Sequence, residues 1–297
     1  MNIALRLILP LLALGLATCA TYTPKPSPVT VMVAAINDFH GNLELPAGGL
    51  PEVNATTREL TSTPAGGVAR MATVLERLRA RHQHFAFVSA GDLVGASPLA
   101  SGYFNDEPTI EALNSLGLDL NGVGNHEFDR GRFELLRLQA GGCPEGGCKS
   151  GLPFGGAKFG FLAANVVVSD SGKTLFPPYA IREFGGVKVA FIGVTLKGTP
   201  AILSPKAVAG LAFHDEVETV NRLVPELKRA GIEAIVVLIH QGGFQRGGPN
   251  DCSELRGPII DIVRHFDRAV DVVISGHTHQ AYVCRIEGRL LTSAGSF

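Results

Sequence analysis

Five short segments of the sequence combine histidine, aspartate and asparagine with glycine. They are residues 37–41, 91–92, 124–129, 240–242 and 275–279, and they hold five of the nine histidines of the chain. A mixture of carboxylate, amide and imidazole groups suits Zn, Mn or Fe(II) better than Ca or Mg, which prefer oxygen ligands. The segments therefore predict a transition-metal site.

The candidate ligands are too many for one metal ion. They are Asp38, His40, Asp92, Asn125, His240, His277 and His279. Seven ligands fit two divalent ions, and a carboxylate such as Asp92 can bridge a pair of ions that lie about 3.5–4 Å apart. Such a pair acidifies a bound water and clamps the attacking and leaving oxygens of a phosphoryl group. The predicted chemistry is thus phosphoester hydrolysis.

Each of these segments follows an apolar run that predicts a β-strand. The runs cover residues 29–36, 85–90, 120–123, 235–239 and 272–274. In an open α/β sheet, binding sites lie at the carboxyl ends of the strands, so the five segments are expected to converge.

Helical patterns alternate with the strands. Helices are predicted over residues 67–80, 108–116, 132–140, 216–230 and 258–266, with a kink or break at Pro225. Further strands are predicted over residues 159–168, in a hairpin over 179–184 and 187–194, and over 282–286 and 289–292. This alternation predicts an α/β fold in which helices cover the faces of the sheet.

The first residues read as a targeting segment. A short apolar run and small residues predict a signal peptide over residues 1–20, followed by a Pro-rich linker over 21–28 and one domain over 29–297. Residues 16–19 resemble a bacterial lipoprotein box, although Thr18 is unusual in it. Lipid attachment at Cys19, with membrane anchoring, and ordinary cleavage near Ala20 remain alternatives. Either way, a periplasmic or cell-surface location is expected.

The other four cysteines fit an exported protein. Cys143 and Cys148 bracket a turn-rich loop, which leaves Cys252 to pair with Cys284. A zinc site made of these cysteines is the alternative, but the sequence has no Cys-x-x-Cys pair. The net charge of −1 and the pI near 6.8 give no basic excess, so a nucleic-acid partner is not predicted. No feature indicates a protein partner.

The five motifs, in this order, resemble those of the calcineurin-like metallophosphoesterases. Residues 37–42, 124–129 and 276–279 are similar to the bacterial periplasmic 5′-nucleotidase branch, which includes UDP-sugar hydrolases and 2′,3′-cyclic phosphodiesterases. The resemblance implies a four-layer αββα sandwich. It also implies one metal at Asp38, His40, Asp92 and His279 and a second at Asp92, Asn125, His240 and His277.

The resemblance also implies two residues that act beside the metals. His126 would contact the transferring phosphoryl group, and Asp129 would orient His126. An imidazole in such a role needs a second partner to fix its tautomer, which favours this pairing without the resemblance. The alternative for Asp129 is a helix N-cap.

The expected function is that of a 5′-nucleotidase-type phosphomonoesterase acting on extracytoplasmic nucleotides. A phosphodiesterase or pyrophosphatase acting on cyclic nucleotides or nucleotide sugars is an alternative with the same metals. A non-catalytic exported binding protein that keeps the fold is a third. The resemblance further implies that a C-terminal substrate-binding domain is absent, because the sequence has 18 residues after His279.

Overall fold

The computed structural model describes residues 28–46, 49–53 and 59–297. The predicted signal peptide, Cys19 and most of the predicted linker lie outside these residues. Within them, no helix combines the length and the hydropathy that a bilayer span requires.

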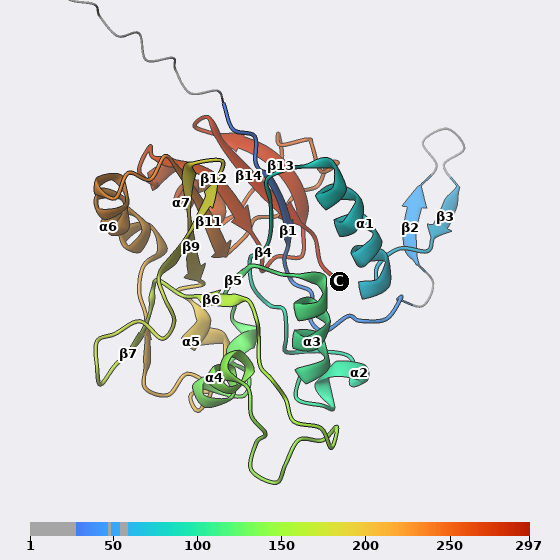
Figure 1. The fold of residues 1–297 in the computed structure, drawn as a ribbon. Helices are drawn as coiled ribbons and strands as arrows, with labels where there is room; N and C mark the ends of the chain where they lie inside the picture. The colour runs from blue at the N-terminus through green and yellow to red at the C-terminus, as the bar shows by residue number, and fades with distance from the viewer. Residues whose placement is uncertain (1–27, 47–48, 54–58) are drawn as a thin grey trace, which may run out of the picture.

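Two β-sheets form the centre of the molecule (Figure 1). The four-stranded sheet is parallel and has the order β1 (Met32–Ile36), β4 (Phe85–Ser89), β5 (Leu120–Gly122) and β6 (Gly160–Leu162). The six-stranded sheet has the order β13 (Ala281–Ile286), β14 (Arg289–Ala294), β12 (Val270–Ser275), β11 (Ala234–His240), β9 (Val187–Thr195) and β8 (Tyr179–Phe184). Its four inner strands are parallel, and β13 and β8 pair antiparallel at the edges.

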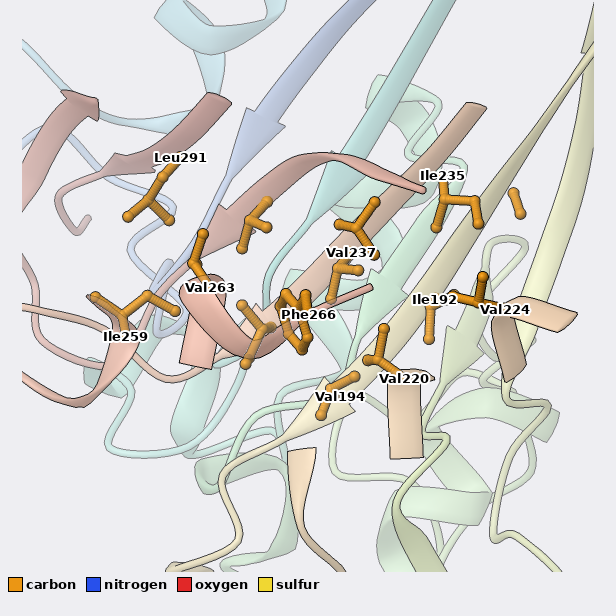
Figure 2. Close-up of a cluster of buried hydrophobic side chains, with 14 of the residues drawn as sticks. Ile192, Val194, Val220, Val224, Ile235, Val237, Ile259, Val263, Phe266 and Leu291 are labelled. Atoms are coloured by element: carbon orange, nitrogen blue, oxygen red, sulfur yellow. The ribbon is translucent and has the colours of Figure 1, made fainter. Parts of the chain in front are cut away.

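The two sheets pack face to face, and helices cover their outer faces. Val88, Leu120 and Leu162 of the first sheet share a buried cluster with Phe191 and Leu238 of the second. On the outer face of the first sheet, another core joins β4 and β6 to α1 (Val68–Arg81), α3 (Glu107–Leu116) and α4 (Arg132–Ala140). α6 (Glu216–Arg229) and α7 (Pro258–His265) cover the second sheet (Figure 2). The predicted four-layer αββα sandwich is confirmed.

Two glycines let the sheets approach each other closely. A Cβ at Gly122 of β5 would lie 2.7 Å from the carbonyl oxygen of Leu238 on β11. A Cβ at Gly193 of β9 would lie 2.5 Å from the carbonyl oxygen of Leu162 on β6. Backbone therefore faces backbone at these points, near the carboxyl ends of the parallel strands.

Gly193→Ala is expected to destabilise the sandwich, because its added methyl group overlaps the Leu162 backbone, which belongs to a strand and has no room to move. We expect the free energy of unfolding to fall by about 1–3 kcal/mol, as for other overpacked cores, in urea titrations. Gly155→Ala is the control, because that glycine has no neighbouring atom within 4 Å of the added methyl position. Equal stability of the two variants would contradict the close approach of the sheets.

The prediction of one strand over residues 159–168 is wrong. β6 ends at Leu162, and Val166–Val168 form β7, which pairs antiparallel with β10 (Leu211–Phe213). The buried Asn165 causes the break: its side chain donates to the carbonyl oxygens of Thr195 and His214 and accepts from the Thr195 N–H. The chain thus leaves the first sheet to bind the end of β9.

Pro225 was expected either to kink or to break its helix, and the helix is not broken. α6 continues through it to Arg229. Val220, Val224 and Leu227 of α6 are fully buried against the second sheet, so packing holds the helix where the proline removes a hydrogen bond. Several short elements were not predicted: β2 (Leu50–Val53), β3 (Leu60–Thr63), α2 (Leu99–Gly102), α5 (Thr199–Ile202) and β10.

All four cysteines in the described part of the chain are paired. Cys143 bonds to Cys148 and Cys252 bonds to Cys284. The first disulfide closes the loop after α4, and the second ties the segment before α7 to β13. This pairing excludes the alternative of a four-cysteine zinc site. Two disulfides are typical of proteins in oxidising compartments.

Candidate metal centre

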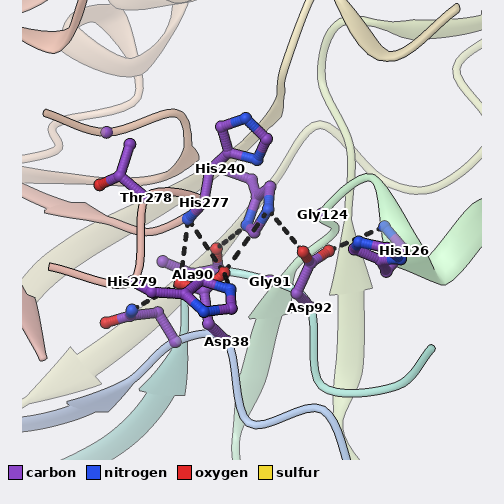
Figure 3. A network of polar contacts seen from close by, with 12 residues as sticks. Asp38, Ala90, Gly91, Asp92, Gly124, His126, His240, His277, Thr278 and His279 are labelled. Atoms are coloured by element: carbon purple, nitrogen blue, oxygen red, sulfur yellow. Dashed lines mark hydrogen bonds and ion pairs between the residues drawn. The ribbon is translucent and has the colours of Figure 1, made fainter. Parts of the chain in front are cut away.

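The predicted ligands come together at one edge of the sandwich, where five parallel strands end. Figure 3 shows Asp38, Asp92, His240, His277 and His279 at this edge. Asp38 and His40 follow β1, Asp92 follows β4, and Asn125 follows β5. His240 is the last residue of β11, and His277 and His279 follow β12. β4, β5 and β11 are mostly buried and β1 is half-buried, and the polar residues that follow or end these strands meet at this edge.

The side chains form two groups, each able to hold a metal ion. One group is Asp38, His40 and His279, and the other is Asp92, His240 and His277; within each, the ligand atoms lie within 4.8 Å of one another. Asp92 also joins the groups: its Oδ2 lies 2.9 Å from His240 Nε2 and 3.7 Å from His40 Nε2. The arrangement is consistent with a dinuclear metal centre.

Backbone carbonyls fix the tautomers of two of the histidines. His40 Nδ1 donates to the carbonyl oxygen of Gly95 at 2.7 Å, and His240 Nδ1 donates to that of Ala90 at 2.8 Å. A carbonyl only accepts, so Nδ1 carries a proton in both rings and Nε2 faces the centre. Nε2 of His40 is also only 3.3 Å from Nε2 of His279. This short distance fits two nitrogen lone pairs that are directed at one cation.

Asn125 provides a test of whether a metal fits. Its side-chain Oδ1 is buried and has no hydrogen-bond partner in the protein. A buried acceptor left unpaired costs about 1–3 kcal/mol, and a bound cation would remove that cost. The orphaned oxygen and the mixed carboxylate, amide and imidazole donors both fit a transition-metal ion.

Without a metal, a proton partly takes its place. Burial opposes charge on His240, but the Asp92 carboxylate outweighs it and raises the pKa of His240 to about 10. Burial and the neighbouring His240 charge lower the pKa of His277 to about 4, which leaves that ring neutral and able to ligate. Metal binding at this group must therefore release a proton from His240.

The backbone is strained at five of the seven predicted ligands. Asp38, His40, Asp92, His277 and His279 have φ angles between 45° and 74°, and they are half of the ten non-glycine residues with positive φ among those described. This left-handed region costs of order 1–3 kcal/mol for each strained residue. The surrounding sandwich must supply that free energy to aim the side chains inward.

His126 and Asp129 lie beside the ligand groups. His126 Nδ1 is 2.8 Å from Asp129 Oδ2, and this hydrogen bond is the main cause of the raised pKa of His126. The centre of the His126 ring is 5.1 Å from the centre of the His40 ring, and the backbone N–H of His126 donates to Asp92 Oδ1. Asp129 is not a helix N-cap, since α4 begins after Gly131.

Glu127 is a residue of the site that the sequence analysis did not single out. Its carboxylate is buried and accepts from the backbone N–H groups of Asp92, Leu93 and Gly124 and from the Asn121 side chain. Burial, and then the charge of Asp92, raise the pKa of Glu127 to about 7. Glu127 therefore ties the loop of Asp92 to the loop of Asn125. The signal for Glu127 in the sequence was an acidic residue within a loop that lies between buried strands.

Glu127→Gln is expected to loosen this tie, because an amide has one acceptor oxygen where the carboxylate has two. At pH 8, at least one buried N–H then loses its partner, and we expect the free energy of unfolding of the metal-free protein to fall by about 2–3 kcal/mol. Chemical denaturation would measure it, with Glu111→Gln on the exposed face of α3 as the control. Unchanged stability would show that the backbone alone holds the two loops.

Comparison with known proteins decides the family. Residues 31–281 match the family model of the calcineurin-like phosphoesterases. The chain belongs to the calcineurin-like phosphoesterase family. A snake venom 5′-nucleotidase from Gloydius brevicauda is 30% identical to this phosphoesterase over 285 residues, which cover 89% of this chain and 43% of the relative.

Two further comparisons agree. The crystal structure of a 5′-nucleotidase precursor from Thermus thermophilus superposes with a TM-score of 0.67 and 27% identity, covering 90% of this phosphoesterase and 49% of that chain. Endonuclease YhcR of Bacillus subtilis is 32% identical over 270 residues, which are 90% of this chain and 21% of the relative. This phosphoesterase is related to the 5′-nucleotidase branch, and it spans less than half the length of these three relatives.

Proposed function

We propose that this phosphoesterase is a dinuclear metal-dependent phosphomonoesterase of the 5′-nucleotidase type that acts on nucleotides outside the cytoplasm. The observation that carries the proposal is the pair of ligand groups joined by Asp92, with His126 beside them. The similarity to 5′-nucleotidases supports the substrate class, and the two disulfides support the location.

Each proposed ion would have four protein ligands. Asp38, His40, Asp92 and His279 would hold one, and Asp92, Asn125, His240 and His277 the other. When bound, two such ions acidify a water molecule and neutralise charge on a phosphoryl group. The carbonyls of Gly95 and Ala90 keep His40 and His240 in the tautomer that ligation needs.

His126 and Asp129 would together carry out the proton transfer to the phosphoryl group or the leaving group. Asp129 accepts from His126 Nδ1, which leaves Nε2 as the nitrogen that can donate to a phosphoryl oxygen or to the departing alkoxide. The two side chains are about one-third exposed, so a substrate can reach them. The Asp129 carboxylate also stabilises the positive charge on the ring before the proton is given up.

The test is hydrolysis of 4-nitrophenyl phosphate and of AMP with added Mn²⁺ or Zn²⁺. We expect turnover of both that a chelator abolishes and that the metal restores. A folded, metal-loaded sample that hydrolyses neither would overturn the enzymatic proposal and favour the non-catalytic exported binding protein.

A phosphodiesterase is the second candidate, and one observation favours it: a relative that matches over 90% of this chain is named an endonuclease. The same ligand groups suit both reactions. Bis(4-nitrophenyl) phosphate separates them, because a phosphodiesterase would hydrolyse it faster than 4-nitrophenyl phosphate, and the proposed phosphomonoesterase would do the reverse.

A further inference from the structure

A cavity of about 540 Å³ is lined in part by Asp129, the hydrogen-bond partner of His126. Its walls come from residues 129–133, at the start of α4, and from residues 204–210, after α5. Asp129 forms part of the wall, so the cavity adjoins the group that would orient the proton donor. None of the predicted metal ligands lines it. Its role is therefore not explained by the metal centre.

The cavity contains a guanidinium group with a fixed position. Arg132 Cζ lies 4.9 Å from the centre of the Phe133 ring, and Arg132 Nη1 donates to the carbonyl oxygen of Gly210 at 3.1 Å. A Cβ at Gly210 would lie 2.8 Å from Nη1, so the guanidinium rests against the bare Cα of that glycine. Phe133 is 74% exposed, so the ring beside the guanidinium is accessible to a ligand.

The charge of the cavity is positive and mostly uncompensated. Arg132 and Lys206 form no ion pair with any residue that the structure describes. Arg130 is already engaged, since it donates to Asn105 Oδ1 and the Gly102 carbonyl. The one carboxylate in the wall, Asp129, is bound by His126. Two cations are thus left facing the same space.

We propose that this cavity, the Arg132–Lys206 subsite, binds a second phosphate group carried by the leaving group of the substrate. The preferred substrates are then nucleotides with a phosphate beyond the scissile one, rather than nucleoside monophosphates. A planar guanidinium matches phosphate oxygens two at a time, and a lysine ammonium adds a point charge. This inference rests on the proposed function, because it assumes that a phosphoryl group is transferred beside His126.

The position of Arg132 favours such recognition. A guanidinium held on Phe133 and Gly210 loses little conformational freedom when it binds an anion, so more of the interaction appears as affinity. The Phe133 ring also offers an apolar face beside the charge, as a ribose or base would require. The subsite would act on substrate selection, because Arg132 and Lys206 belong to neither ligand group.

The first experiment compares substrates. In the wild-type protein we expect a higher kcat/KM for adenosine 3′,5′-bisphosphate than for AMP. Lys206→Ala and Arg132→Gln should each lower that ratio about tenfold, mainly through KM, which is the effect of losing one charged hydrogen bond. Lys188→Ala is the control, because Lys188 is exposed at the amino end of β9, opposite the site. An unchanged ratio, or an equal loss for both nucleotides, would overturn the subsite.

The second experiment does not depend on turnover. Calorimetric titration of the chelator-treated, metal-free proteins with adenosine 3′,5′-bisphosphate, which they cannot hydrolyse, should show about tenfold weaker binding for Lys206→Ala than for wild type and Lys188→Ala. Equal binding by all three proteins overturns the subsite, whatever the enzyme does. A wild-type protein that binds the bisphosphate through Lys206 but hydrolyses no phosphoester, including 4-nitrophenyl phosphate, overturns the proposed function and leaves the anion site standing.

Discussion

Asp92→Asn is expected to remove metal from both positions and to lower kcat by at least about a thousandfold, since metal ions contribute several kcal/mol to such reactions. The Asp92 carboxylate faces His240 Nε2 and His40 Nε2, which belong to different ligand groups. Asparagine has the same shape but no charge, so each ion would lose its shared anionic ligand. The loss at two positions from one substitution is the distinctive result.

Elemental analysis after dialysis measures this effect directly. Wild-type protein should retain two metal ions per chain and the Asp92→Asn variant close to none. Asp261→Asn serves as the control, because that carboxylate lies exposed on α7. If the Asp92 variant keeps both ions, the bridging role is wrong; if it keeps one, Asp92 belongs to a single group.

His126→Ala is expected to separate catalysis from metal binding. The ring belongs to neither ligand group and is one-third exposed, so its removal should leave two ions bound and the fold intact. Loss of a positioned proton donor typically costs about 10²–10⁴-fold in rate, and we expect kcat for AMP to fall by that amount. Asp129→Asn should cause a smaller loss, because the ring remains but its orientation is less well fixed.

The control for His126→Ala is His82→Ala, at the end of α1 away from the ligand loops. Metal content and kcat must be measured on the same samples. A fall in metal content would make His126 a ligand, and a rate near that of wild type would remove it from the mechanism.

The sequence was sufficient to predict the architecture and the convergence of the loops that carry the candidate ligands. Buried strands such as β11 are continuous apolar runs, and parallel strands end at one edge, so the polar residues after them were expected to meet. The same reasoning failed at residues 159–168. An apolar run has the same pattern whether it forms one strand or two, and the buried bonds of Asn165 to Thr195 and His214 appear only in three dimensions.

Other features depend on contacts between distant loops. Glu127 acts through the N–H groups of Asp92 and Leu93, about 34 residues away along the chain, and no local pattern predicts that pairing. The cavity that Asp129 lines is likewise formed between the start of α4 and residues 204–210. Residue type and spacing predicted which side chains could bind metal, whereas the contacts that support them follow from the packing of the sandwich.

The strained backbone at the ligands bears on how such a site survives in evolution. Glycine at any of those five left-handed positions would relieve backbone strain. Selection for stability alone would therefore favour glycine in place of Asp38, His40, Asp92, His277 and His279. In the metal-free protein, His279→Gly should accordingly raise Tm; a lower Tm would show that the side chain supports the fold. All five positions nevertheless carry candidate metal ligands, as expected where the side chains are needed for metal binding rather than for stability.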